Sequence, residues 1–182
     1  MGDTLSRVKV GVLLDQEPGE ISEWLADAAA FDAGGADALW IDSGPAPELD
    51  VLALAAALAA VTFRSRLVVA LPDAGVSSAG RTLDTIGRLS HNRLALISDE
   101  DLPAGVEVFR RVAGGFESGR DTAERWVTTP VPQGRAAWRT ACVEAAGRGI
   151  RGLVVPADSR LLDILRNPDD PGDRGDLQLA QG

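Results

Sequence analysis

Short apolar stretches alternate along this chain with longer stretches of helical period, and this alternation constrains the fold more than any other feature. The short stretches are apolar on both faces, which is typical of buried parallel strands. Between them, apolar residues recur at intervals of three and four, as in Ile21, Trp24 and Ala28, which predicts amphipathic helices. The predicted strands are residues 8–14, 38–41, 67–71, 93–97, 126–129 and 150–155.

The predicted helices fill the intervals between these strands. Glycine pairs, proline and capping aspartates bound them. The first helix begins near Ile21 and ends at Gly34-Gly35. Three others cover residues 47–63, 83–89 and 138–145. A further helix is capped by Asp101 and ends at Gly114-Gly115, and the last is capped by Asp158 and ends at Asn167-Pro168.

This order predicts six β–α units joined by right-handed crossovers. A closed barrel of eight such units typically takes about 250 residues, and about 200 at the low end. The chain has 182 residues. The fold class predicted is therefore α/β, a truncated (β/α) TIM-barrel-like fold of about six parallel strands with alternating helices, with an open doubly wound sheet as the alternative. We expect a single domain over residues 1–168 and a mobile polar tail over 169–182.

Composition narrows the function classes. The net charge is −9, and no tyrosine is present, so neither a basic stripe nor an aromatic platform for nucleic acid is expected. No apolar run reaches the roughly 18 residues of a membrane span, and residues 1–10 contain no apolar segment of the secretory kind. A lone cysteine, Cys142, excludes an internal disulfide. These features predict a cytoplasmic protein with neither a nucleic-acid nor a membrane partner.

The helix predicted over residues 50–61 has no polar face, because its sequence is DVLALAAALAAV. A helix that is apolar all round is buried all round. Its outer side is covered either by the rest of this domain or by a second subunit, and a short barrel has few elements of its own to cover it. We therefore expect a homodimer that pairs through this helix.

Several segments resemble the luciferase-like monooxygenases. LALAAALAAVTFRSRLVVAL and RTLDTIGRLSHNRLALI are similar to the second helix, third strand, third helix and fourth strand of that family, and GGADALWIDSGP is similar to its second strand. The closing GIRGLVVPADSRLLDILRNPDD resembles the C-terminal segments of short members. The resemblance implies a barrel that binds FMN or the deazaflavin F420 at the C-terminal ends of its strands, monooxygenase or other oxidoreductase chemistry at that site, and commonly a dimer.

The sequence departs from the family pattern at the strand ends. Family members often carry Asp-His where this chain has Asp42, Ser43 and Gly44, and often a Gly-x-Gly segment where Ile97 is followed by SDEDLP. Two interpretations stay open. The chain is either a flavin-dependent oxidoreductase, or a degenerate, non-catalytic family member that acts as a dimeric small-molecule-binding or interaction protein.

A ligand of a β–α protein lies beyond the carboxyl ends of the strands. That rim is rich in carboxylates, which either face a ligand or cap the helices that follow. The sequence selects no catalytic residue and no metal site, since no spacing matches a Mg²⁺ or Ca²⁺ loop. His91 lies in a helix-to-strand turn, and Cys142 lies on an apolar helix face. The cofactor-binding residues predicted on the rim are Asp42, Ser43, Asp73, Arg81, Ser98 and Thr128.

Overall fold

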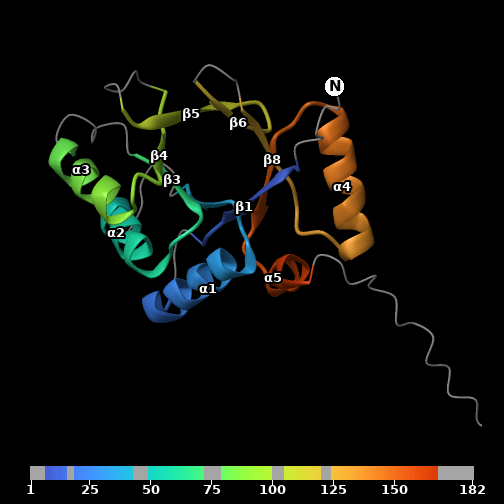
Figure 1. Cartoon of the computed structure of the whole chain (residues 1–182), viewed down its shortest axis with the longest axis horizontal. Coiled ribbons are helices and arrows are strands. Elements are labelled where there is room, and N and C mark those ends of the chain that lie inside the picture. Colours follow the sequence, from blue (N-terminus) through green and yellow to red (C-terminus); the bar gives the residue numbers. More distant parts are fainter. Residues whose placement is uncertain are drawn as a thin grey trace, which may run out of the picture.

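The computed structural model describes residues 7–15, 19–42, 49–71, 79–99, 105–119 and 124–167. Within this part of the chain, eight strands close into one barrel and five helices lie outside it (Figure 1). The strands are β1 (Lys9–Leu13), β2 (Ala38–Ile41), β3 (Arg66–Ala70), β4 (Leu94–Ile97), β5 (Glu107–Val112), β6 (Gly115–Ser118), β7 (Arg125–Thr128) and β8 (Gly152–Pro156). The helices are α1 (Ile21–Gly34), α2 (Val51–Val61), α3 (Gly80–Leu89), α4 (Arg135–Gly147) and α5 (Ser159–Arg166).

The barrel is mixed. Strands follow one another around the ring in chain order, and β8 closes it against β1 in parallel register, with Gly11 opposite Val154. β6 runs antiparallel to both β5 and β7, while the other neighbouring pairs are parallel. The predicted fold class, six parallel strands alternating with helices in a truncated TIM-like barrel, is therefore wrong. The open-sheet alternative is also wrong, because the sheet closes.

The error lies in the segment before Gly114-Gly115. The sequence predicted a helix there, but residues 107–112 form β5, and Gly114 adopts the left-handed φ of 76° in a tight turn to β6. β5 and β6 fill two places in the ring with ten residues, so the chain closes a barrel although it is shorter than one built from repeated β–α units. Asp101, the predicted helix cap, lies outside the described residues.

The remaining predicted elements agree with the structure. Each of the six predicted strands overlaps an observed one, and five predicted helices correspond to α1–α5. The capping signals are also confirmed. Gly35 ends α1 in the left-handed conformation (φ 96°), and Asp158 accepts an N–H bond at the start of α5. The cap of α2 was not predicted: Asp50 accepts N–H bonds there, and the helix begins at Val51. The predicted tail, residues 169–182, lies outside the described residues.

Two layers of apolar side chains hold the fold together. The larger layer lies between the barrel wall and the helices and includes Leu39, Leu58, Leu67 and Leu161. The second fills the barrel itself. Figure 1 shows the helices ranged around the ring except beside β5 and β6, where no helix of the described residues lies. The outward side chains of Arg110 and Arg125 in that region are exposed, which suits a strand surface that faces water.

Candidate functional site

Four aromatic side chains occupy the inside of the barrel. Trp40 lies at the centre of the group, with ring centroids 5.2 Å from Phe109, 4.6 Å from Phe116 and 5.4 Å from Trp126. Phe109 and Trp126 meet edge to face at 6.5 Å. These separations are those of stabilising aromatic pairs. The exposed fraction of each ring is 5% or less, so the group forms a packed core.

Glycines make room for the two indoles. A Cβ on Gly152 would lie 2.6 Å from Cζ3 of Trp126 and closer still to two other ring atoms, and a Cβ on Gly11 would lie 2.9 Å from Cδ1 of Trp40. The indole Nε1 atoms of Trp40 and Trp126 are buried and have no hydrogen-bond partner among the described residues. The protein's own side chains therefore fill the barrel interior up to the backbone. This packing leaves the two indole N–H donors without a hydrogen-bond acceptor among the described residues.

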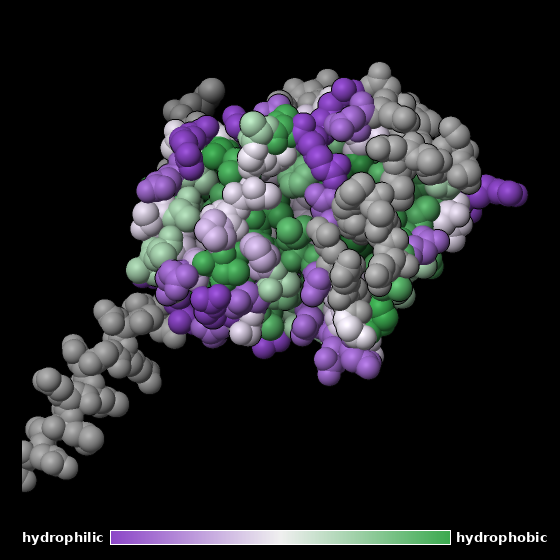
Figure 2. All heavy atoms as spheres, turned by 180° about the vertical axis from the view of Figure 1, so that it is seen from behind, coloured by the Kyte–Doolittle hydropathy of each residue, from purple (hydrophilic) through white to green (hydrophobic). Residues whose placement is uncertain are grey.

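The C-terminal ends of the parallel strands form one mouth of the barrel, where the sequence predicted the cofactor. Asp42 follows β2 there, and its carboxylate forms an ion pair with Arg111 of β5. Thr128, the last residue of β7, donates from Oγ1 to the carbonyl of Gly114 at 3.2 Å. The backbone N–H of Ser98 donates to the carbonyl of Phe109 at 3.0 Å. Figure 2, which views this side, shows hydrophilic and hydrophobic residues intermixed.

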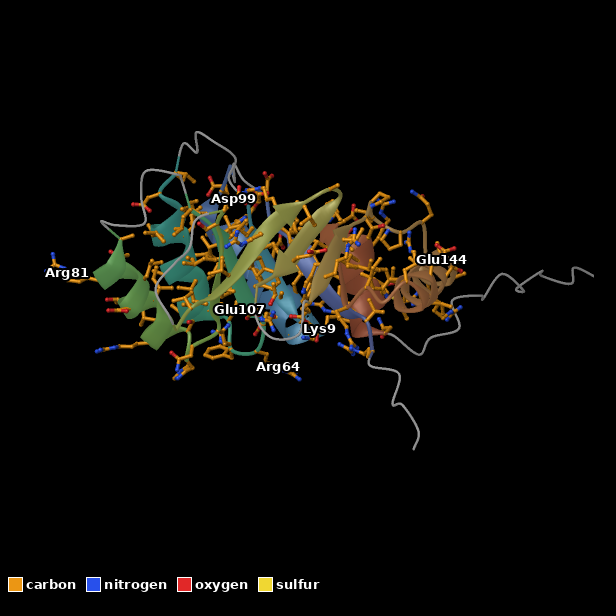
Figure 3. The ribbon with its side chains drawn as sticks, turned by 90° about the horizontal axis from the view of Figure 1, so that it is seen from above. Lys9, Arg64, Arg81, Asp99, Glu107 and Glu144 are labelled. Atoms are coloured by element: carbon orange, nitrogen blue, oxygen red, sulfur yellow. The ribbon has the colours of Figure 1, made fainter. Side chains whose placement is uncertain are left out.

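The predicted rim residues are thus only partly brought together. Asp42, Ser98 and Thr128 do lie at the C-terminal ends of strands. Arg81 is exposed on α3 and points away from the barrel, at the outer edge of Figure 3. Ser43 and Asp73 lie outside the described residues. Sequence reasoning missed Arg111, because it lies on the strand that was predicted as a helix.

The opposite mouth, at the N-terminal ends of the strands, is closed by four charged side chains. Arg66 of β3 reaches Glu107 at 3.3 Å and Glu124 at 3.0 Å, and Glu124 also pairs with Lys9 of β1. Arg66 lies over the Phe109 ring at 5.7 Å, which joins this network to the aromatic core. Burial alone would raise the pKa of Glu124, but its hydrogen bonds to Lys9 and Arg66 outweigh burial and lower it. Glu124 is therefore ionised at neutral pH.

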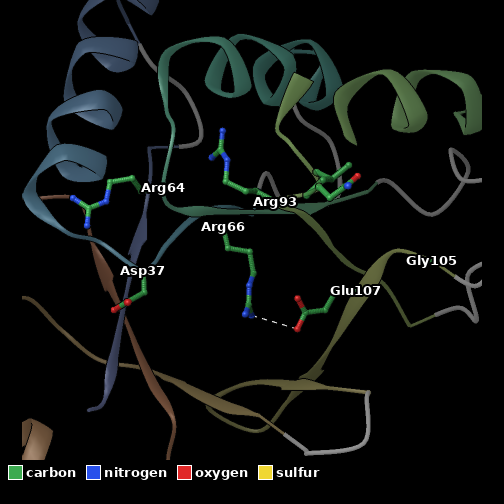
Figure 4. A pocket seen from close by; sticks show the side chains of 8 residues that line it. Asp37, Arg64, Arg66, Arg93, Gly105 and Glu107 are labelled. Carbon is green, nitrogen blue, oxygen red and sulfur yellow. Dashed lines mark hydrogen bonds and ion pairs between the residues drawn. The ribbon is translucent and has the colours of Figure 1, made fainter. Parts of the chain in front are cut away.

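A polar pocket of about 390 Å³ opens beside this network (Figure 4). Figure 3 shows that Arg64 and Glu107 lie on the side of the molecule opposite Asp99, so the pocket belongs to the N-terminal side. Pockets of this size hold small molecules in other proteins. The lining residues are Asp37, Arg64, Arg66, Asn92, Arg93, Leu94, Gly105 and Glu107.

One wall of the pocket is the loop between α2 and β3, which the buried Asp32 and the half-buried Arg93 hold in place. Asp32, at the end of α1, accepts the backbone N–H groups of Phe63 at 2.9 Å, Arg64 at 3.0 Å and Ser65 at 2.6 Å. Burial alone would raise the pKa of Asp32, but these backbone bonds outweigh burial and lower it. Such a carboxylate with three N–H donors stays charged and fixes the loop.

Arg93 holds the same loop through its carbonyl groups. Its guanidinium donates to the carbonyls of Thr62 at 2.7 Å and Ser65 at 2.6 Å, while its buried Nε has no partner among the described residues. Burial lowers the pKa of Arg93, and the charge of Asp32 partly offsets this. The pocket thus has a preformed wall, since Asp32 holds the N–H groups of the loop and Arg93 holds its carbonyls.

Other residue types that mark functional sites are absent from the described residues or are occupied structurally. No group of three His, Cys, Asp or Glu side chains there could hold a metal ion. His91 is exposed in a turn, as predicted. Cys142 is half-buried on α4, where it packs against the apolar core, and burial raises the pKa of its thiol. In the same part of the chain, no helix has the length and apolar character that crossing a membrane requires.

Comparisons with known proteins assign this chain to no family. No model of a protein family matches the chain, and no curated protein matches it significantly. The resemblance to luciferase-like monooxygenases therefore gains no support as an indication of oxidoreductase activity, and the TIM-barrel architecture that it implied is contradicted by the mixed barrel. The resemblance itself stays a prediction.

Proposed function

We propose that this protein is a non-catalytic small-molecule-binding protein, and that its ligand occupies the polar pocket at the N-terminal side of the barrel. The observation that carries the proposal is the pocket itself, about 390 Å³ beside a rigid loop, with the guanidinium of Arg64 unpaired among the described residues. A preformed concave site with a few convergent polar groups is the usual form of a ligand site.

Three of the acids and bases with shifted pKa values surround this pocket and the neighbouring ion-pair network, which supports placing the site there. Titratable groups with shifted pKa values gather at functional sites. Asp32, Arg93 and Glu124, whose pKa values are lowered, all lie around the N-terminal side. Asp158 and Arg160, whose pKa values are also shifted, follow β8 at the other side, where they pair with each other at the start of α5. At the other mouth, Asp42 and Arg111 neutralise each other. Among the described residues, that pair leaves Arg111 without a free positive charge for the phosphate of a flavin, so we do not propose flavin chemistry.

Two exposed glycines give a direct test by nuclear magnetic resonance. Gly105 lines the pocket, whereas Gly114 lies in the β5–β6 turn at the opposite mouth. A small-molecule library is screened against ¹⁵N-labelled protein, and the amide signals of both glycines are followed. We expect the ligands that bind to shift the Gly105 signal and the side-chain amide of Asn92, and to leave Gly114 in place. Ligands that shift Gly114 alone would place the site at the C-terminal mouth and refute the proposal.

A second function, self-association through α2, is favoured by the surface of that helix. Residues 51–61 carry no charge, Ala53 and Ala60 are exposed, and Phe63 just beyond the helix is 75% exposed. A large exposed apolar side chain beside an uncharged helix face is typical of an interaction surface. A second copy of this chain suits it, since copies that each carry a net charge of −9 approach best through an uncharged face.

Light scattering at micromolar concentration tests the pairing. We expect twice the mass of one chain for the unaltered protein and the mass of one chain for the double variant Ala53→Glu/Ala60→Glu. Ala137→Glu, at an exposed alanine of α4, is the matched control and is expected to stay dimeric. A single-chain mass for the unaltered protein would remove this function and leave the pocket proposal intact.

We also propose that the protein works in the cytoplasm. Its single cysteine suits a reducing compartment. Its net charge of −9 and the absence of tyrosine argue against a nucleic-acid partner. Fractionation of cells that express the full chain, followed by immunoblotting, tests the location. Recovery with the cytosolic fraction is expected, and recovery with membranes contradicts the proposal.

A further inference from the structure

We infer that the ligand of the N-terminal pocket carries an oxyanion, a phosphate or carboxylate group, and that Arg64 is its principal contact. This inference rests on the proposed function, since it names the chemistry of the molecule that the pocket takes.

The carboxylates of the pocket already have cationic partners. Asp37 accepts from Arg7 at 3.2 Å and from the backbone N–H of Val10 at 2.7 Å. Glu107 accepts from Arg66 at 3.3 Å. A cationic ligand would therefore have to compete with an existing pair at each carboxylate. The acidic residues make the pocket polar without making it a cation site.

Two of the arginines, in contrast, have no carboxylate partner within hydrogen-bonding distance among the described residues. Arg93 donates to the neutral oxygens of Thr62 and Ser65, so its positive charge is held in place without a direct ion pair. Arg64 makes no hydrogen bond or ion pair through its side chain to any described residue, although its backbone N–H is fixed by Asp32 at 3.0 Å. Arg64 thus combines a backbone that Asp32 fixes with a guanidinium that has no partner among the described residues.

The remaining donors suit an oxyanion. A guanidinium presents a planar fork of N–H groups that matches a carboxylate or phosphate with two parallel hydrogen bonds. Asn92, which lines the same pocket, is exposed in the left-handed conformation (φ 60°) and adds a carboxamide donor. Figure 4 shows Arg64 on the α2–β3 loop and Arg93 just before β4, with the Arg66–Glu107 pair over the middle of the barrel.

Isothermal titration calorimetry with three simple probes tests the inference. Inorganic phosphate and acetate separate the two oxyanion classes, and methylammonium tests the opposite charge. We expect phosphate or acetate to bind the unaltered protein with a Kd on the order of 1 mM, and Arg64→Gln to weaken that binding about tenfold, as the loss of a charge-assisted hydrogen bond does. Arg139→Gln removes the same charge from an exposed position of α4 and is expected to change the Kd less than about twofold.

Each contrary result has a distinct meaning. The oxyanion inference is overturned by any of three results. These are tighter binding of methylammonium than of either anion, an unchanged Kd for the anion in Arg64→Gln, or equal weakening of anion binding by Arg64→Gln and Arg139→Gln. If neither anion binds but library compounds still shift the Gly105 amide, the inference fails and the proposed function stands. If no compound of any charge shifts Gly105, the proposed function fails with it.

Discussion

Replacing Gly152 by alanine tests whether the barrel is filled as the structure shows. Gly152 lies in β8 directly opposite Trp126 in register, and a Cβ there would lie 2.6 Å from Cζ3 of the indole and closer to Cε3 and Cδ2. Carbon atoms in favourable contact are about 3.5–4.0 Å apart. The ring cannot yield, since Trp126 is 1% exposed and lies against Trp40 and Phe109.

The expected cost follows from this overlap. Forcing an extra carbon into a packed core typically costs about 1–3 kcal/mol, and the contact here is with a rigid ring rather than a flexible chain end. We expect Gly152→Ala to lower the free energy of unfolding by about 3 kcal/mol, at the upper end of that range. Urea denaturation followed by tryptophan fluorescence measures it, with the slope of the transition checked for two-state behaviour.

Two further variants make the test specific. Gly87 lies inside α3, and a Cβ there would meet nothing within 4 Å, so Gly87→Ala is expected to stabilise the protein by up to about 1 kcal/mol through helix propensity. Trp126→Leu removes the ring, and Gly152→Ala is expected to cost clearly less in that background. If Gly152→Ala leaves stability unchanged in the unaltered protein, the interior is not packed as described.

The remaining predictions concern the loop, the helix cap and the thiol. Asp32→Asn leaves at least one of the three loop N–H groups without its acceptor and is expected to cost about 2 kcal/mol in urea denaturation, whereas Asp27→Asn, exposed on the same helix, is expected to be neutral. Because the folded-state pKa of Asp32 lies below its usual 3.8, its stabilising effect is complete above that pH and is lost as the pH falls toward the folded-state value. Thermal melts from pH 5 to pH 2 are therefore expected to be less steeply pH-dependent in Asp32→Asn, and parallel curves would contradict this. Asp50→Ala removes the cap of α2 and is expected to cost about 1 kcal/mol; an equal loss in Asp84→Ala, mid-helix and exposed, would argue against capping. Cys142, whose pKa is raised by burial, is expected to react with Ellman's reagent more slowly in folded than in urea-unfolded protein, and equal rates would show an accessible thiolate.

Local sequence patterns were enough to locate most of the elements. Buried strands such as Ala38–Ile41 are apolar throughout, and helices such as α1 carry both an apolar period and a terminal glycine. These signals depend on neighbours within a few residues, so one sequence reveals them. The hairpin of β5 and β6 was wrongly predicted as a helix. Its first strand, EVFRRV, has apolar residues at spacings compatible with either a helix or a strand, and Gly114-Gly115 suits a helix end or a turn equally.

The candidate site could not be predicted in the same way. Its residues come from the α2–β3 loop, the α3–β4 turn and β5, which only the closed barrel brings to one side. The sequence instead predicted a site at the opposite mouth, because ligands of parallel β–α proteins lie at the C-terminal ends of the strands. Its one available signal was the run Arg64-Ser65-Arg66 with Asn92-Arg93, a local surplus of arginine in a chain with a net charge of −9.

The most direct test of the account compares the two mouths of the barrel in one experiment. ¹⁵N-labelled protein is titrated separately with inorganic phosphate, FMN and F420, and the amide signals of Gly105 and Gly114 are recorded. We expect phosphate to shift Gly105, Arg64→Gln to reduce this shift severalfold at the same concentration, and neither flavin to move Gly114. A saturable shift of Gly114 by FMN or F420 would contradict the account, because the ligand would then lie at the C-terminal ends of the strands.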